Sequence, residues 1–139
     1  MTTYNLLKQS CGLSHREAAA YLDVRESRSK DWSAGRVLTP PGVLAGLFEL
    51  VLRQEAAAEE ALAVIEAAID KHGLPQSIPI GVSVDDHEAQ SLGWPCVAAH
   101  MAVIRRLIEM LEPEIVPLIE IVPRGSTPET AAAADAHGK

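Results

Sequence analysis

Apolar residues at helical spacing predict three short helices at the start of the chain, over residues 3–10, 15–22 and 25–34. Gly12 follows the first helix as a residue suited to a left-handed C-terminal cap. Ser14 begins the second helix as its N-cap, and Glu17, three positions later, completes a capping box. A tight turn at residues 23–24 leads into the third helix, which Gly35 closes.

A much longer helix is predicted for residues 42–72, directly after Pro40 and Pro41. Its apolar residues recur every three or four positions: Leu47, Leu50, Val51, Leu62, Ile65 and Ile69. The pattern fits one long helix or two collinear ones. A helix of this length reaches about 45 Å, more than a small core needs, so we expect its stem to meet another chain.

Two short strands are predicted in the second half of the chain, over residues 78–84 and 115–122. The first alternates strictly and sets four apolar residues on one face: Ile78, Ile80, Val82 and Val84. Pro79 and Pro117 cannot donate a backbone hydrogen bond, so both segments are expected at a sheet edge.

Between these strands, a second long helix is predicted to open at Trp94 and Pro95 and to end before Pro113. Its apolar seam consists of Val97, Met101, Ile104, Ile108 and Leu111. We interpret the seam as core or dimer packing, with a small-molecule pocket as the alternative.

The pattern as a whole predicts a mainly α fold with a small β element. A helix-turn-helix bundle is expected over residues 1–54. The long helix and a strand-helix-strand dimerisation unit are expected over residues 55–124, and a disordered tail over residues 125–139.

Charge is distributed unevenly between the two halves. The whole chain carries a net charge of −7, which by itself argues against binding nucleic acid. Residues 1–54, however, hold seven basic and five acidic residues, whereas residues 55–139 hold five basic and fourteen acidic residues. Because phosphate contacts are local, the N-terminal part remains suited to DNA.

The N-terminal helices have the residue types that a helix-turn-helix needs. Ala18 and Ala19 supply small side chains where the two helices cross, and Val24 fills the space beneath the turn. The third helix begins with polar residues, and Trp32 anchors its far end. The alternative is an ordinary three-helix cluster whose arginines are merely solvated.

The run Gly-Leu-Ser-x-x-Glu-Ala-Ala-x-Tyr-Leu-x-Val, followed by Trp-x-x-Gly-x-x-x-x-Pro, resembles the Xre/Cro family over about residues 4–45. The resemblance implies that Ser14 and His15 touch phosphate. It implies a groove-facing set of Arg25, Glu26, Ser27 and Arg28, with Lys30, Asp31 and Arg36 near the DNA backbone. Within this set, Arg28 is best suited to bidentate contact with guanine.

At one position the chain departs from the family pattern. Three residues before Trp32 the family has an apolar core residue, and this chain has Ser29. Either the third helix is rotated slightly, or Trp32 and the first helix supply the missing contact.

The order of the later segments resembles that of dimeric regulators of anti-CRISPR operons. These proteins join such a motif to a long helix, a strand and a helix that begins with tryptophan. The matching pieces here are the helix at 42–72, the strand at 78–84 and the run from Trp94 to Ala99. This resemblance implies a homodimer.

Other chemistry-bearing residues are scattered. The run Asp85, Asp86, His87 and Glu88 has metal-ligand types, but neighbouring positions on a turn point in different directions. Cys11 and Cys96 lack CxxC spacing and are expected as reduced thiols. We expect no metal, no cofactor and no enzymatic activity.

The sequence therefore predicts a DNA-binding transcriptional regulator, expected to act as a repressor and as a homodimer on a palindromic site in double-stranded DNA. The absence of a secretory signal and of a run of about 20 apolar residues favours a cytoplasmic protein without membrane contact. The alternative is an antitoxin or interaction module whose C-terminal half binds a partner such as a toxin.

Overall fold

The computed structural model describes residues 1–125, which are mainly helical and include a small two-stranded sheet. The chain divides into two compact units, Met1–Arg53 and a second that begins at Gln54. The expected disordered tail, apart from Gly125, lies outside the described residues.

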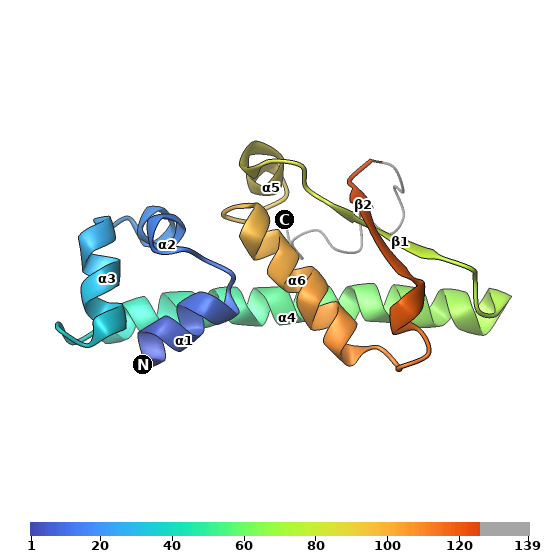
Figure 1. The fold of residues 1–139 in the computed structure, drawn as a ribbon, viewed down its shortest axis with the longest axis horizontal. Coiled ribbons are helices and arrows are strands. Elements are labelled where there is room, and N and C mark those ends of the chain that lie inside the picture. The colour runs from blue at the N-terminus through green and yellow to red at the C-terminus, as the bar shows by residue number, and fades with distance from the viewer. Residues whose placement is uncertain (126–139) are drawn as a thin grey trace. The chain divides into compact units, whose positions relative to one another are not determined.

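Unit 1 contains three short helices beside the first part of a long one (Figure 1). These are α1 (Thr3–Ser10), α2 (His15–Leu22), α3 (Glu26–Ala34) and the beginning of α4 (Pro41–His72). The predicted capping box of α2 is present, because the Ser14 side chain accepts from the Glu17 amide while the Glu17 carboxylate accepts from the Ser14 amide. The bounds predicted for α1 and α2 are confirmed, and α3 begins one residue later than predicted.

The core of unit 1 is built from small and aromatic side chains. Ala18 and Ala19 are buried, as a close crossing of α2 requires. Tyr4 and Trp32 meet edge to face with 5.4 Å between ring centroids. The buried Cys11 thiol donates to the Leu47 carbonyl oxygen at 3.5 Å, which ties the end of α1 to α4.

The long helix is a single element, which decides between one helix and two. α4 runs from Pro41 to His72 and continues through Gly46. Gly73 follows the last helical residue and stops the helix, because its φ of 81° is the left-handed conformation that glycine adopts without strain. The boundary between the two units falls inside α4.

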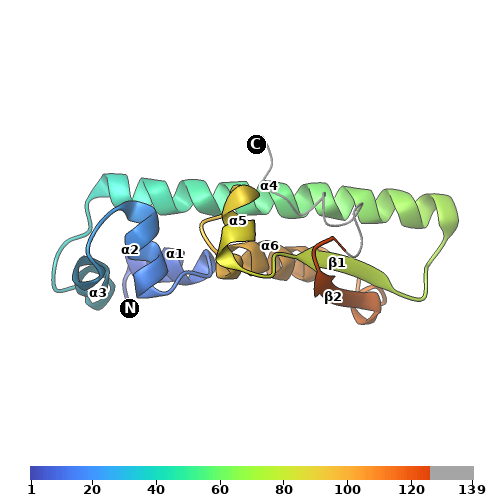
Figure 2. The same cartoon turned by 90° about the horizontal axis from the view of Figure 1, so that it is seen from above.

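Unit 2 contains the remainder of α4 and the two-stranded sheet, in which β1 and β2 lie side by side (Figure 2). Its elements are β1 (Ile78–Val82), α5 (Asp86–Ser91), α6 (Val97–Met110), the 3-10 helix η1 (Val116–Leu118) and β2 (Ile119–Pro123). Its buried core is drawn from α4, β1, α5, α6 and the loop between α5 and α6, and includes Ala57, Ala58, Ile80, Trp94, Val103 and Leu107.

Three predicted boundaries in unit 2 are wrong. β1 ends at Val82, and Val84 is 64% exposed instead of sharing the buried face. α6 begins at Val97, because Cys96 has extended backbone angles and serves as the N-cap. β2 begins only at Ile119, because Pro117 lies in the short 3-10 helix that precedes it.

The two strands pair in parallel, a relation that the sequence did not predict. Ile78 lies opposite Ile119, Ile80 opposite Ile121, and Val82 opposite Pro123. β1 is largely buried, whereas most of β2 is exposed. Among residues 1–125, no helix is both long enough and apolar enough to cross a membrane.

Candidate nucleic-acid interface

α2 and α3 are joined by a short turn with defined backbone geometry. Asp23 caps the end of α2 with a left-handed φ of 57°, a conformation that aspartate tolerates better than most residues. The Val24 amide donates to the Ala19 carbonyl at 3.0 Å, and Arg25 is the N-cap of α3. This is the helix, tight turn and helix that the sequence predicts.

α3 buries one side and exposes the other. Ser29 is fully buried and Trp32 is 4% exposed, so these two residues define the inner side. The sequence-predicted groove-facing residues, Arg25, Glu26, Ser27 and Arg28, are all exposed, and so are Lys30 and Arg36. The structure therefore places Arg25, Glu26, Ser27 and Arg28 together at the N-terminal end of α3, whereas Lys30 lies in the middle of the helix and Arg36 follows its C-terminal end.

Ser29 occupies the inner position directly, which settles the departure noted in the sequence. Its hydroxyl hydrogen bonds with the Tyr4 hydroxyl at 2.6 Å and with Nδ1 of His15 at 2.9 Å. α1 supplies Tyr4, so α1 provides the contact where the family pattern has an apolar side chain. Burial raises the pKa of Tyr4, although the hydrogen bond with Ser29 acts in the opposite direction.

His15 lies at the first turn of α2, where the resemblance implies a phosphate contact. Its ring is half-buried and turned toward Ser29 through Nδ1. Desolvation lowers the pKa of His15, and the nearby cations Lys8 and Lys30 lower it further, against a smaller opposing effect of Glu26. The imidazole is therefore neutral at neutral pH and braces α2 against α3.

Two of the cations at this surface are paired within the chain. Lys30 lies 3.1 Å from Glu26 across one turn of α3, and Arg36 Nε lies 3.0 Å from Asp31. Among the described residues, Arg25 and Arg28 form no ion pair. Their guanidinium groups are thus positive charges at the start of α3 that no residue between 1 and 125 neutralises.

Two basic residues near this surface were absent from the sequence-predicted set. Arg16 is exposed on α2, next to His15. Lys8 is buried, donates from Nζ to the Leu13 carbonyl at 3.1 Å, and has a pKa lowered by desolvation. The sequence could have indicated a structural role for Lys8 from its position in the last turn of α1, because cations stabilise that end of a helix.

The seam expected to mediate dimerisation lies on α6. Ile104 is 1% exposed and Leu111 is 8% exposed, so both contribute to the core of unit 2. Val97 and Ile108 are half-buried, and Met101 is 39% exposed. Two of the five seam residues are thus buried within a single chain and two more are half-buried, and the part of the seam in a dimer stays a prediction.

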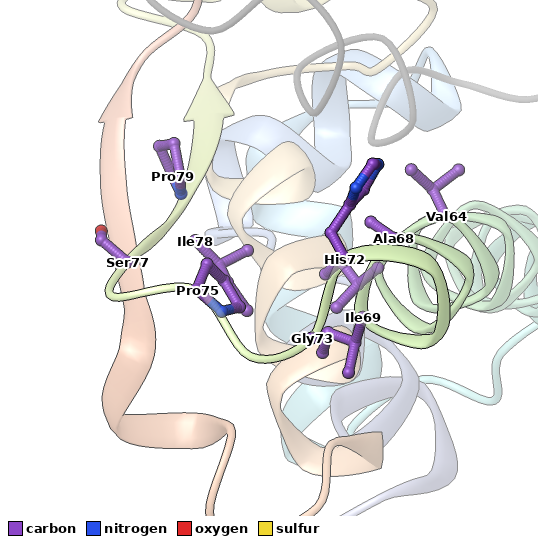
Figure 3. Close-up of a pocket in the computed structure, with 10 residues that line it drawn as sticks. Val64, Ala68, Ile69, His72, Gly73, Pro75, Ser77, Ile78 and Pro79 are labelled. Carbon is purple, nitrogen blue, oxygen red and sulfur yellow. The ribbon is translucent and has the colours of Figure 1, made fainter.

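Unit 2 also has an apolar groove, at the end of α4, which could accommodate a partner (Figure 3). It encloses about 230 Å³, and Val64, Ala68 and Ile69 of α4 line it from one side. Pro75, Ile78 and Pro79, from the segment that leads into β1, line it from the other.

The acidic run at residues 85–88 serves as local caps. Asp85 accepts from the Glu88 amide, Asp86 from the Val97 amide, and Glu88 from the Val84 amide. Within the described part of the chain, no three histidine, cysteine or acidic residues are grouped as a metal would need. This part of unit 2 is held together by its carboxylates.

His100 and Ser83 form a buried pair. The Ser83 amide and hydroxyl both lie against Nδ1 of His100, at 3.2 and 2.6 Å, and the ring stacks on Trp94. His100 is fully buried and Ser83 is 2% exposed, so the pair joins the end of β1 to α6 without meeting solvent.

No model of a known protein family matches the chain, and no similar sequence is found among curated proteins.

Proposed function

We propose that the protein is a cytoplasmic, sequence-specific DNA-binding transcriptional regulator of the helix-turn-helix kind, which inserts α3 into the major groove. The observation that carries the proposal is the exposed N-terminal end of α3, where Arg25 and Arg28 form no ion pair with any residue of the described part of the chain. In a helix-turn-helix, this end of the second helix meets the base edges.

The burial pattern supports the same orientation. Ser29 and Trp32 fix the inner side of α3, so a groove-bound helix would present Ser27 and Lys30 from its opposite side. Arg28 lies one turn before Trp32, where the inner side of α3 meets solvent, and its exposed fork of donors suits the O6 and N7 acceptors of guanine.

A homodimer on a palindromic site completes the proposal. One such motif makes few base contacts, and two half-sites about 34 Å apart would multiply its selectivity. Repression is the expected outcome, because a dimer bound over a promoter excludes polymerase.

The test is selection of random duplex DNA by the purified protein, followed by affinity measurement at two salt concentrations. Arg28→Ala should weaken binding by about 1–3 kcal/mol and relax the selected sequence at one position. Lys71→Ala removes the same charge from an exposed site in unit 2 and serves as the matched control. A wild type that enriches no sequence, or equal losses in the two variants, would refute the proposal.

A second candidate function is an interaction module such as an antitoxin. The apolar groove lined by Val64, Ile69 and Ile78 favours it, because an aliphatic surface of this kind suits a protein partner. Ile69→Asp would then abolish neutralisation of a toxin in a growth assay while leaving DNA selection unchanged. Arg28→Ala should have the reverse effect.

A further inference from the structure

We infer that the outer edge of β2 is the homodimer interface, where it pairs antiparallel with β2 of a second copy. This deepens the proposed function, because it assigns the surface that joins the two halves of a palindrome-binding dimer. Four observations within unit 2 carry it, and none depends on DNA.

The first observation is the sheet itself. Among the described residues it has two strands, and they are parallel. Parallel sheets are normally covered on both faces, and a pair of strands alone is marginally stable. Ile121 is nevertheless 41% exposed, although its partner Ile80 is 1% exposed. Ile80 and Ile121 lie side by side on the same face of the sheet, and this apolar face is covered at β1 but exposed at β2.

The second observation is the direction of the backbone groups of β2. The Arg124 amide donates to the Val82 carbonyl at 2.8 Å, so it points toward β1. The backbone N–H and C=O groups of successive residues in a strand point to alternate sides. The backbone groups of Val122 and Glu120 therefore also point toward β1. Ile121 therefore directs its N–H and C=O outward, away from the sheet.

The third observation explains why the assembly would close at two copies. The outward-pointing residues of β1 are Pro79, which has no N–H, and Gly81, which is buried. β1 therefore offers no usable edge. Pairing through β2 alone gives a four-stranded sheet with a two-fold axis, which is a closed arrangement.

The fourth observation is charge, which disfavours one register of the pairing and favours another. A two-fold axis at Glu120 would set two carboxylates directly opposite each other, which is unfavourable. An axis at Val122 instead sets Glu120 of one copy opposite Arg124 of the other, twice. It also sets Val122 opposite its own equivalent and lets each Ile121 amide donate to the carbonyl of Pro123 in the partner copy.

The inference is tested on the full-length protein without DNA. The wild type should sediment as a dimer at micromolar concentration. Glu120→Arg and Arg124→Glu should each weaken dimerisation roughly tenfold or more, because each turns two opposite-charge pairs into like-charge pairs. An equimolar mixture of the two variants should restore dimers, because every cross-strand pair is then again of opposite charge.

Cross-linking tests the register. Directly opposed residues of a non-hydrogen-bonded pair have Cα atoms about 4.5 Å apart, within the range of a disulfide. Val122→Cys should therefore form an intermolecular disulfide readily. Ile121→Cys, whose equivalents would lie about 7–8 Å apart on a diagonal, should do so slowly. Far-ultraviolet circular dichroism checks that each variant keeps its helices.

A monomeric wild type, a mixture that stays monomeric, or faster cross-linking at residue 121 than at residue 122 would each overturn the inference. Loss of sequence-specific DNA binding by an intact dimer would refute the proposed function and leave this interface standing. A variant that lacks β2 and still forms a dimer would refute this interface and leave the proposed function standing.

Discussion

The hydroxyl of Ser29 can be removed with little change of shape, which makes it the sharpest probe of unit 1. In Ser29→Ala, the Tyr4 hydroxyl loses its partner at 2.6 Å and His15 loses its partner at 2.9 Å. Tyr4 is only 1% exposed, so water cannot replace the lost hydrogen bond there. The half-buried ring of His15 can still turn to solvent.

The size of the effect follows from which group is left without a partner. A buried hydroxyl deprived of its hydrogen bond costs about 1–3 kcal/mol, and the exposed part of His15 adds little. We therefore expect Ser29→Ala to lower the free energy of unfolding by about 1–3 kcal/mol. The melting temperature should fall by about 2–8 °C for each kcal/mol. Ser27→Ala, on the exposed side of the same helix, should stay within about 0.5 kcal/mol.

The assay is denaturant unfolding followed by the fluorescence of Trp32. The chain has a second tryptophan, Trp94, in unit 2, so all variants are compared in a Trp94→Phe background. A double-mutant cycle with Tyr4→Phe isolates the hydrogen bond. The double variant should be more stable than the sum of the single losses implies, by about 0.5–3 kcal/mol. Strict additivity, or a Ser29→Ala variant as stable as Ser27→Ala, would refute the proposed network.

Two further predictions concern pH and backbone geometry. The pKa of His15 is lowered by folding, so the unfolded chain takes up its proton first, and wild-type stability should fall as pH drops below about 6.5. His15→Gln should flatten this part of the curve of melting temperature against pH, and an unchanged curve would contradict the assignment. Gly35 has a φ of 78°, so Gly35→Ala should cost about 1–2 kcal/mol through its backbone alone. Gly42→Ala, which meets open space at the start of α4, should be neutral or stabilising by up to about 1 kcal/mol in the same melts, and equal losses would count against a backbone origin.

Local signals predicted the helices of unit 1 well. The capping box of Ser14 and Glu17 lies within four residues, so the start of α2 is encoded where it occurs. The same holds for Gly35 after α3 and for Pro40 and Pro41 at the start of α4. Each of these signals acts through its own backbone and needs no distant partner.

Interactions between distant residues were beyond such signals. The partners of Ser29 include Tyr4, 25 positions away, so the sequence could mark Ser29 as irregular without saying what surrounds it. The parallel pairing of β1 with β2 joins segments about 40 positions apart, and neither strand alone specifies its neighbour. The 3-10 helix before β2 contains Pro117, which the sequence had predicted to lie in an edge strand over residues 115–122.

Each unit carries one cysteine, and both thiols are enclosed. Cys11 has no exposed surface in unit 1, and Cys96 is 3% exposed in unit 2. An alkylating reagent can reach either sulfur only when its surroundings open, so the rate of modification measures local opening. Mass spectrometry of the two cysteine-containing peptides would thus measure the rate of local opening in each unit separately. The measurement needs no substitution and is made under native conditions.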